Sequence, residues 1–186
     1  MNSVDEFLAA DANIRGFTLD NKRRMLYILQ AKDLENADII VVTCSTLTPA
    51  LEEIRPFMRT PVVAIDDEMA EQAVLAGERI VLMASAASTL EPGTIKLHKE
   101  AAKAGREIKL ERIHCAEAYD AIRRMDRETH DRLLIEAAKS IHGADVVVLA
   151  QASMAHLEQK IESQIGIKTL SSPGLCVKRI KRILNF

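Results

Sequence analysis

The chain carries four unbroken apolar runs, and these predict strands that are buried on both faces. The runs are DIIVVT (38–43), PVVAI (61–65), RIVLM (79–83) and DVVVL (145–149). Strands of parallel sheets show such continuous runs because helices cover both faces of the sheet. Two weaker candidates are EIKLERI (107–113), which alternates, and IKTL (167–170).

Segments with helical periodicity lie between the predicted strands. They span residues 21–34, 49–58, 67–76, 92–104, 116–125, 127–141, 155–164 and 175–184. Strands and helices therefore alternate along the chain, which predicts an α/β fold with right-handed crossovers.

An internal repeat appears when the chain is shifted against itself by 107 residues. The segment ADIIVVTCSTL from Ala37 then lies over ADVVVLAQASM from Ala144. The match extends upstream, where Leu26, Ile28, Ala31, Lys32 and Leu34 fall on Leu133, Ile135, Ala138, Lys139 and Ile141. We infer a duplicated βα unit and two pseudo-symmetric lobes with parallel sheets. The expected division is residues 1–76, residues 77–172, and a C-terminal helix in 173–186 that packs back on the body.

The first lobe is shorter than the second. Before its repeated segment the second lobe has RIVLMASAAST, a helix and EIKLERIHC, whereas the first lobe has only a short segment there. We therefore expect the first lobe to lack its first βα unit and the chain to begin late. In a flavodoxin-like sheet this strand is central, so its loss is expected to expose sheet edges and to remove one loop of the site.

Composition narrows the class of protein. Hydrophobic residues make up 48% of the chain, enough for a real core, and 25 Lys and Arg nearly balance 27 Asp and Glu, so there is no broad cationic field for nucleic acid. Only 3% of residues are aromatic, which favours small polar ligands over stacked bases or sugars. No run approaches about 18 apolar residues, so no membrane span is expected. The three widely spaced cysteines form neither a disulfide framework nor a metal motif, which favours a reducing, cytoplasmic location.

The segment T-C-S-T-L-T-P (43–49) places a cysteine where a buried strand ends and a helix begins. Near a helix N-terminus, Ser45 and Thr46 could hold a carboxylate, and the same field would favour the thiolate of Cys44. Alternatively, Cys44 is a small buried apolar side chain, as free cysteines often are.

Two further loops of small polar residues follow predicted strands. In ASAASTLEP (84–92), Ser85, Ser88 and Thr89 could contact a carboxylate or could serve only as helix caps. In LAQASM (149–154), Gln151 corresponds to Cys44 in the repeat. Its amide could orient a substrate or satisfy the loop backbone, but it is no acid or base near pH 7. Ser153 adds a hydroxyl beside it.

Other polar groups have simpler interpretations. His130 and Asp131 are adjacent and are not expected to share one helix face. His114 and Cys115 lack the further ligands that a metal site needs, so no metal is expected. The acidic run 66–68 most simply caps a helix, and the basic residues of 178–182 fit a solvated helix face. Glycine-rich nucleotide motifs and G-x-S-x-G are absent from the sequence.

Taken together, several segments resemble the aspartate/glutamate racemase superfamily. They are V-T-C-S-T, P-V-V-A-I-D-D-E-M-A-E-Q-A-V, R-I-V-L-M-A-S-A-A-S-T-L, the H-D pair and V-L-A-Q-A-S-M-A, and the resemblance runs from Val4 onward. It implies two flavodoxin-like lobes, a cleft between them, and cofactor-independent proton transfer beside a carboxylate. The superfamily includes amino-acid racemases, hydantoin racemases, maleate isomerases and arylmalonate decarboxylases.

The resemblance also assigns roles to residues. Racemases of the superfamily use one cysteine from each lobe; Cys44 matches the first, and Gln151 stands in place of the second. The resemblance further implies that the carboxylate is bound by Ser45, Thr46, Ser85 and Ser88, and that Ser153 lines the second wall.

We therefore expect a racemase-like or isomerase-like enzyme, independent of pyridoxal phosphate or any other cofactor, that acts on a small carboxylate at Cys44. One alternative is a single-cysteine decarboxylase, although the decarboxylases of the superfamily keep their cysteine on the other lobe. Another is a carboxylate-binding protein without catalysis. A homodimer is expected because sheet edges and apolar helix faces invite pairing.

Overall fold

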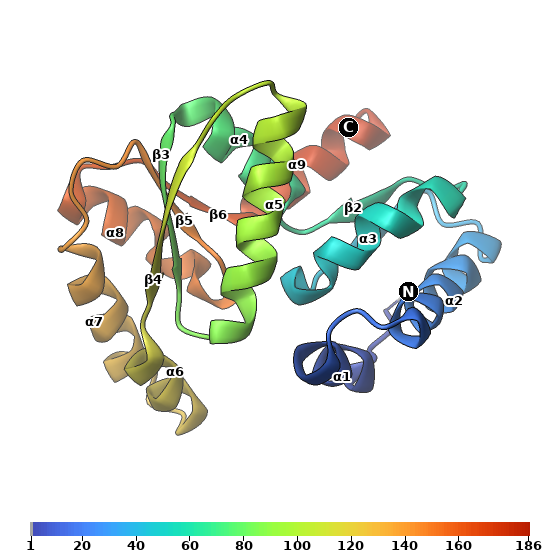
Figure 1. Ribbon diagram of the computed structural model, residues 1–186, viewed down its shortest axis with the longest axis horizontal. Helices are drawn as coiled ribbons and strands as arrows, with labels where there is room; N and C mark the ends of the chain where they lie inside the picture. Colours follow the sequence, from blue (N-terminus) through green and yellow to red (C-terminus); the bar gives the residue numbers. More distant parts are fainter. Residues whose placement is uncertain (1) are drawn as a thin grey trace.

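The computed structural model describes residues 2–186 and contains two parallel sheets (Figure 1). The first sheet pairs β1 (Ile40–Val42) with β2 (Val62–Ala64). The second holds β3 (Arg79–Ala84), β4 (Lys109–His114), β5 (Val146–Leu149) and β6 (Thr169–Ser171) in the order β4-β3-β5-β6. All pairings are parallel, and this order is that of a flavodoxin-like sheet. The predicted α/β class with two lobes is confirmed.

Helices connect and cover the strands. The α-helices are α1 (Glu6–Arg15), α2 (Leu19–Leu34), α3 (Thr48–Ile54), α4 (Asp67–Ala76), α5 (Leu90–Lys103), α6 (Ala116–Arg123), α7 (Arg127–Ala138), α8 (Glu158–Ile165) and α9 (Ser172–Leu184). Short 3-10 turns are η1 (Ser45–Leu47), η2 (Arg55–Phe57), η3 (Ala87–Thr89) and η4 (Ala152–Leu157). Across residues 2–186, no helix combines the length and apolarity needed to cross a bilayer.

Local chemistry accounts for where several helices begin and end. The Thr18 and Asp126 side chains accept backbone N–H groups in the first turns of α2 and α7. The predicted helix 49–58 instead stops at Ile54 and continues as η2, where Pro56 has no N–H for the helical ladder.

The repeat inferred from the sequence extends to the hydrogen-bonding register. Ile40 pairs with Val62 in the first sheet, and Val147 pairs with Thr169 in the second. Adding 107 to both residue numbers of the first pair gives the second pair. The same shift relates the next two pairs along the strands. The β1-β2 sheet is therefore a copy of the β5-β6 half of the larger sheet, in the same register.

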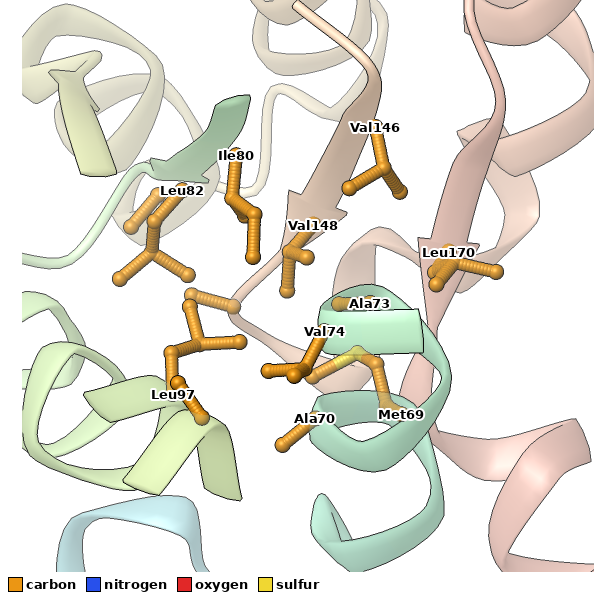
Figure 2. Close-up of a cluster of buried hydrophobic side chains, with 13 residues drawn as sticks. Met69, Ala70, Ala73, Val74, Ile80, Leu82, Leu97, Val146, Val148 and Leu170 are labelled. Atoms are coloured by element: carbon orange, nitrogen blue, oxygen red, sulfur yellow. The ribbon is translucent and has the colours of Figure 1, made fainter. Parts of the chain in front are cut away.

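The last helix of each repeat covers the sheet of the other lobe. Helix α4 follows β2 in the chain, yet Figure 2 shows its apolar face against β3 and β5. The cluster joins Met69, Ala70, Ala73 and Val74 to Ile80, Leu82, Val146 and Val148. Conversely, Cys176 and Ile180 of α9 pack with Val63 and Ile65 at β2. The two lobes are thus interlocked by an exchange of equivalent helices, and α4 and α9 also contact each other.

The two sheets differ in size within residues 2–186: the first has two strands and the second has four. In the larger sheet, β3 and β4 lie beyond β5, whereas no strand among the described residues pairs with the corresponding edge of β1. The edge of β1 presents unpaired backbone groups as a result.

The start of β3 is held by the carboxylate of Asp145, the residue just before β5. Asp145 Oδ2 accepts the backbone N–H groups of Glu78 at 3.0 Å and of Arg79 at 2.8 Å. The Arg79 guanidinium donates to Asp145 Oδ1 at 2.8 Å, and these bonds lower the pKa of Asp145 to about 2. Gly77 precedes this clamp, and a Cβ added there would stand 2.2 Å from Asp145 Cβ.

We expect Gly77→Ala to lower the free energy of unfolding by about 2 kcal/mol, because the new methyl displaces Asp145 from the clamp. Denaturant unfolding measures this loss. Gly174→Ala is the matched control, since its added Cβ meets nothing within 4 Å, and it should leave stability unchanged or slightly higher. Equal stability of the two variants would contradict the proposed clash.

Candidate active site at the strand ends

Strand ends from both lobes converge on one small cavity. It is lined by Ser45 after β1, Asp66 after β2, Thr89 after β3 and Ala150 after β5, together with Lys96 of α5. Ligands of open α/β sheets bind beyond the carboxyl ends of strands, so this is the expected place for a site. The cavity measures about 10 Å³, room for a single water. The two lobes therefore meet closely here.

Cys44 occupies the strand end that the sequence indicated. It is the N-cap residue of η1, it is half-buried, and its thiol is free. Ser45 is half-buried and Thr46 is buried in the same turn. Because η1 contacts η3 and α5, this turn lies against the loop that follows β3.

The other two thiols are less suited to chemistry. Burial raises the pKa of Cys115, and burial together with the charges of Asp67 and Asp66 raises the pKa of Cys176. The raised pKa of each of these two cysteines therefore disfavours its reactive thiolate form.

The side-chain oxygen of Gln151 accepts hydrogen bonds from the loop after β3. Its Oε1 accepts the N–H of Ser85 at 2.7 Å, the N–H of Ala86 at 3.0 Å and the Ser85 hydroxyl at 3.1 Å. Of the two roles left open by the sequence, the amide oxygen adopts that of satisfying the loop backbone. Ser85 is completely buried beneath it. The Ser85 group is therefore occupied by the protein's own side chain.

The remaining predicted contacts are spread out. Ser88 is exposed in η3, and Ser153 is exposed in η4, which packs against α8 and α9. The structure thus brings together the Cys44 turn with the η3 loop, and Ser85 with Gln151. It does not bring Ser153 to the Cys44 turn by any hydrogen bond within residues 2–186.

A buried charge network lies between the lobes, and sequence reasoning missed it. Lys96 of α5 is 3% exposed, and its ammonium pairs with the Asp67 carboxylate of the first lobe. Its Nζ also lies 3.1 Å from Glu52 Oε1 and 3.3 Å from Glu100 Oε1. Burial opposes ionisation, but Asp67, Glu52 and Glu100 raise the pKa of Lys96. The signal in the sequence was the position of this lysine in α5. Lys96 is one of the buried residues of the helix, together with Pro92, Leu97 and Ala101.

The interpretation of residues 66–68 as a simple cap is corrected by the structure. All three side chains are buried, and Asp66 makes no side-chain cap bond. Asp67 accepts the Ala64 N–H at 2.8 Å and pairs with Arg55 as well as Lys96. Burial opposes it, but Lys96 and Arg55 lower the pKa of Asp67. The run joins the lobes rather than merely starting a helix.

Glu68 completes this correction at the C-terminal helix. Its carboxylate lies 3.2 Å from the guanidinium of Arg179, which is half-buried, and 2.7 Å from that of Arg182, which is exposed as the sequence predicted. Burial opposes it, but Arg182 and Gln72 lower the pKa of Glu68 by hydrogen bonding. These bonds tie α4 to α9.

Three histidine contacts were not predicted from the sequence. His114 Nε2 lies 3.0 Å from the Ser85 carbonyl, so the ring donates there and stands beside the loop that Gln151 holds. Further away, Asp131 lies 2.8 Å from both His130 Nδ1 and His156 Nε2. His130 and Asp131 do interact, although they are adjacent. Within residues 2–186, no three His, Cys, Asp or Glu side chains are grouped closely enough to hold a metal ion.

Comparison with known proteins finds a family model and solved structures that are similar to this chain. The family model described as Asp/Glu/Hydantoin racemase matches residues 7–180. A comparison with curated proteins found no match. Solved structures similar to the chain include an allantoin racemase from Klebsiella pneumoniae, with 19% identity and a TM-score of 0.62 over 89% of this chain and 66% of that one.

Two further structures show the same fold. A glutamate racemase from Bacillus anthracis has 16% identity and a TM-score of 0.68, over 93% of this chain and 67% of that one. An arylmalonate decarboxylase has 14% identity and a TM-score of 0.57, over 90% and 78%. The chain therefore spans about two thirds of the length of these racemases.

Asp66 provides a test of the electrostatics at the strand ends. Burial raises its pKa to about 6 and the charge of Asp67 adds to the shift, whereas Lys96 and the Thr48 hydroxyl oppose it. The folded protein therefore binds the Asp66 proton more tightly than the unfolded chain does. The stability that this group contributes is present below about pH 4 and is lost as the pH rises through 6.

We expect Asp66→Asn to raise the free energy of unfolding by on the order of 2 kcal/mol at pH 7.5 and to change it little below pH 4. Urea unfolding across this pH range measures the difference. Asp120→Asn, which changes an exposed carboxylate of α6, should have no comparable pH-dependent effect. A constant difference between Asp66→Asn and wild type at every pH would contradict the raised pKa.

Proposed function

Since the chain belongs to the Asp/Glu/hydantoin racemase family, we propose that it catalyses cofactor-independent proton transfer at the carbon beside a small carboxylate, with Cys44 as the acid/base. The observation that carries the proposal is the position of Cys44. It is a free, half-buried thiol at the end of β1, in the turn that meets the η3 loop of the second lobe. The raised pKa of each other thiol leaves Cys44 as the best candidate.

The chemistry follows from one positioned thiol. The thiolate of Cys44 removes the proton next to the carboxylate, and the thiol returns it to the same face of the carbanion. In this proposal Ser45 and Thr46 bind the carboxylate through their hydroxyls, and Ser88 contributes from η3. These contacts offset the charge that develops on the carboxylate as the proton leaves.

The second lobe takes a different role in this proposal. Gln151 cannot exchange a proton near pH 7, so protonation from the opposite face falls to water. Its amide oxygen is bonded to the loop after β3, whereas its Nε2 has no hydrogen-bond partner within residues 2–186. The Nε2 is therefore free to donate to a substrate, with Ser85 holding the amide in place and Ser153 at the outer wall.

We also propose a cytoplasmic homodimer. Exposed apolar side chains gather on α1 and α2, which supports an association through these helices: Phe7, Ile14, Leu19, Tyr27 and Leu34. Sedimentation of the purified protein tests the dimer directly.

The proposed function predicts α-proton exchange that depends on Cys44. In deuterated buffer, pooled amino acids, hydantoins, maleate and malonates are followed by NMR with wild type, Cys44→Ala and Cys115→Ala. Wild type should exchange the α-proton of at least one compound. Cys44→Ala should slow that exchange by at least about a hundredfold, because it removes the acid/base. Cys115→Ala is the matched control and should keep it.

Other outcomes select other functions. Exchange that persists in Cys44→Ala would remove this residue from the mechanism. Release of carbon dioxide from a malonate, lost in Cys44→Ala, would identify a decarboxylase. Calorimetric binding of a carboxylate without any turnover would identify a binding protein.

A further inference from the structure

One buried carboxylate between the lobes has no cationic partner of its own. Asp66 is 3% exposed and makes no ion pair with residues 2–186. The only side-chain donor that reaches it within this part of the chain is the hydroxyl of Thr48, which lies 3.1 Å from Oδ1 and 3.3 Å from Oδ2. An ionised carboxylate can accept about four hydrogen bonds. Much of the acceptor capacity of Asp66 is therefore unused.

The ammonium of Lys96 does not fill this place. It has three N–H donors, and it already has three carboxylate partners in Asp67, Glu52 and Glu100. The groups joined by these ion pairs, counted together with Asp66, have one carboxylate more than they have cations: Asp66, Asp67, Glu52 and Glu100 against Arg55, Lys96 and Lys103. The buried network thus holds a negative charge that its own cations leave unbalanced.

Asp66 lines the small cavity where the strand ends of the two lobes meet. The cavity measures about 10 Å³, and apart from Lys96 its polar lining consists of Asp66, Ser45 and Thr89. The Thr89 hydroxyl donates to the Ala86 carbonyl at 2.8 Å, so it has only lone pairs left for another partner. The Ser45 hydroxyl makes no hydrogen bond with residues 2–186 and is able to accept one. The occupant that suits this lining is a small hydrogen-bond donor with a positive charge.

The cavity adjoins the turn that carries the candidate thiol. Ser45 follows Cys44 directly, and in the proposed function Ser45 and Thr46 bind the substrate carboxylate. The cavity is too small for a whole substrate, but an ammonium nitrogen is about as large as the water that fits there. A substituent on the carbon beside the bound carboxylate can therefore occupy the cavity while the rest of the molecule stays outside, at the Cys44 turn.

We propose that Asp66 binds a cationic amino group on the α-carbon of the substrate, with Ser45 and Thr89 as further acceptors. Asp66 is then the residue that selects α-amino carboxylates over malonates and maleate. The inference rests on the proposed function for the place of the carboxylate at Ser45. It does not depend on Cys44 as the acid/base, because the selection takes place on binding.

The selection has an attractive part and a repulsive part. An ammonium group gains a charge-assisted hydrogen bond to Asp66 and balances its charge. A second carboxylate on the substrate would instead stand beside the unpaired charge of Asp66, where little water screens the repulsion. Discrimination is strongest when both effects act together. The Thr48 hydroxyl holds the carboxylate of Asp66 in position for either encounter.

The unpaired charge also has a cost for the fold. A buried carboxylate without a cation destabilises the folded protein, and Asn at the same position would not carry this penalty. Residues that lower stability are common in binding and catalytic sites, where their chemistry is needed. The stability lost at Asp66 is thus consistent with a place that becomes balanced only when a ligand is bound.

Three small acids with one skeleton serve as probes. Alanine, isobutyrate and methylmalonate share a carboxylate, an α-proton and a methyl group, and differ only in having an ammonium, a second methyl or a second carboxylate. Their binding to the full chain is measured by calorimetry at pH 8, where Asp66, whose pKa burial raises to about 6, is ionised. Cys44→Ala protein is used throughout, so that turnover does not disturb the measurement.

Alanine should bind at least about tenfold more tightly than isobutyrate, as expected for one hydrogen bond to a charged group. Methylmalonate should bind most weakly. Asp66→Asn, added to the Cys44→Ala protein, should remove the advantage of alanine and should tighten the binding of methylmalonate, because the repelling charge is gone. Asp120→Asn, which changes an exposed carboxylate, is the matched control and should keep the original order.

Several results would overturn the proposal. They are isobutyrate binding as tightly as alanine, no binding of alanine, or an order of affinities that survives Asp66→Asn. Equal weakening of all three acids in Asp66→Asn would show that the residue only supports Thr48 and the start of α3.

The outcome for Asp66 is separate from the outcome for the proposed function. Selection of alanine through Asp66, with no α-proton exchange by the wild-type protein, would leave an amino-acid-binding protein and remove the catalytic role of Cys44. Conversely, Cys44-dependent exchange of a compound without an amino group, unaffected by Asp66→Asn, would keep the proposed function and remove the role of Asp66.

Discussion

The arrangement of the two lobes depends on the ion pairs that the ammonium of Lys96 makes between them. It belongs to the second lobe and is buried among Asp67 and Glu52 of the first. A charge removed from water to this degree is tolerated only with close partners. Separating the lobes would leave Lys96 with Glu100 of its own helix and without its partners Asp67 and Glu52. The strand ends of both lobes are consequently held face to face. The position of Cys44 against the η3 loop is a result of this pairing as much as of the strand that precedes it.

Much of the fold follows from patterns visible in the chain. The apolar runs at 38–43 and 145–149 identified the strands of the repeat, and shifting one onto the other anticipated the lobe symmetry. What the sequence concealed depends on contacts between distant segments. Residues 66–68 look like an ordinary helix start, because their partners Lys96 and Arg179 lie far along the chain. Local propensity cannot distinguish a capping carboxylate from one that is buried in an ion pair.

The candidate site shows the same division between local and distant information. The end of β1 could be located from a buried run followed by small polar residues. The sequence left two roles open for Gln151, and only the fold shows its oxygen on the Ser85 and Ala86 N–H groups. The two equivalent strand ends are therefore chemically unequal. A free thiol follows β1, and an amide that is already hydrogen-bonded to the loop after β3 follows β5.

The exchange of α4 and α9 between lobes bears on how the chain acquires its structure during synthesis. The sheet of the first lobe is covered by Cys176 and Ile180, near the end of the chain. Until those residues leave the ribosome, β1 and β2 have one uncovered apolar face, although both strands have already emerged. A domain normally folds as soon as it is complete. Here the sheet that is translated first acquires its cover only when the last helix has been translated.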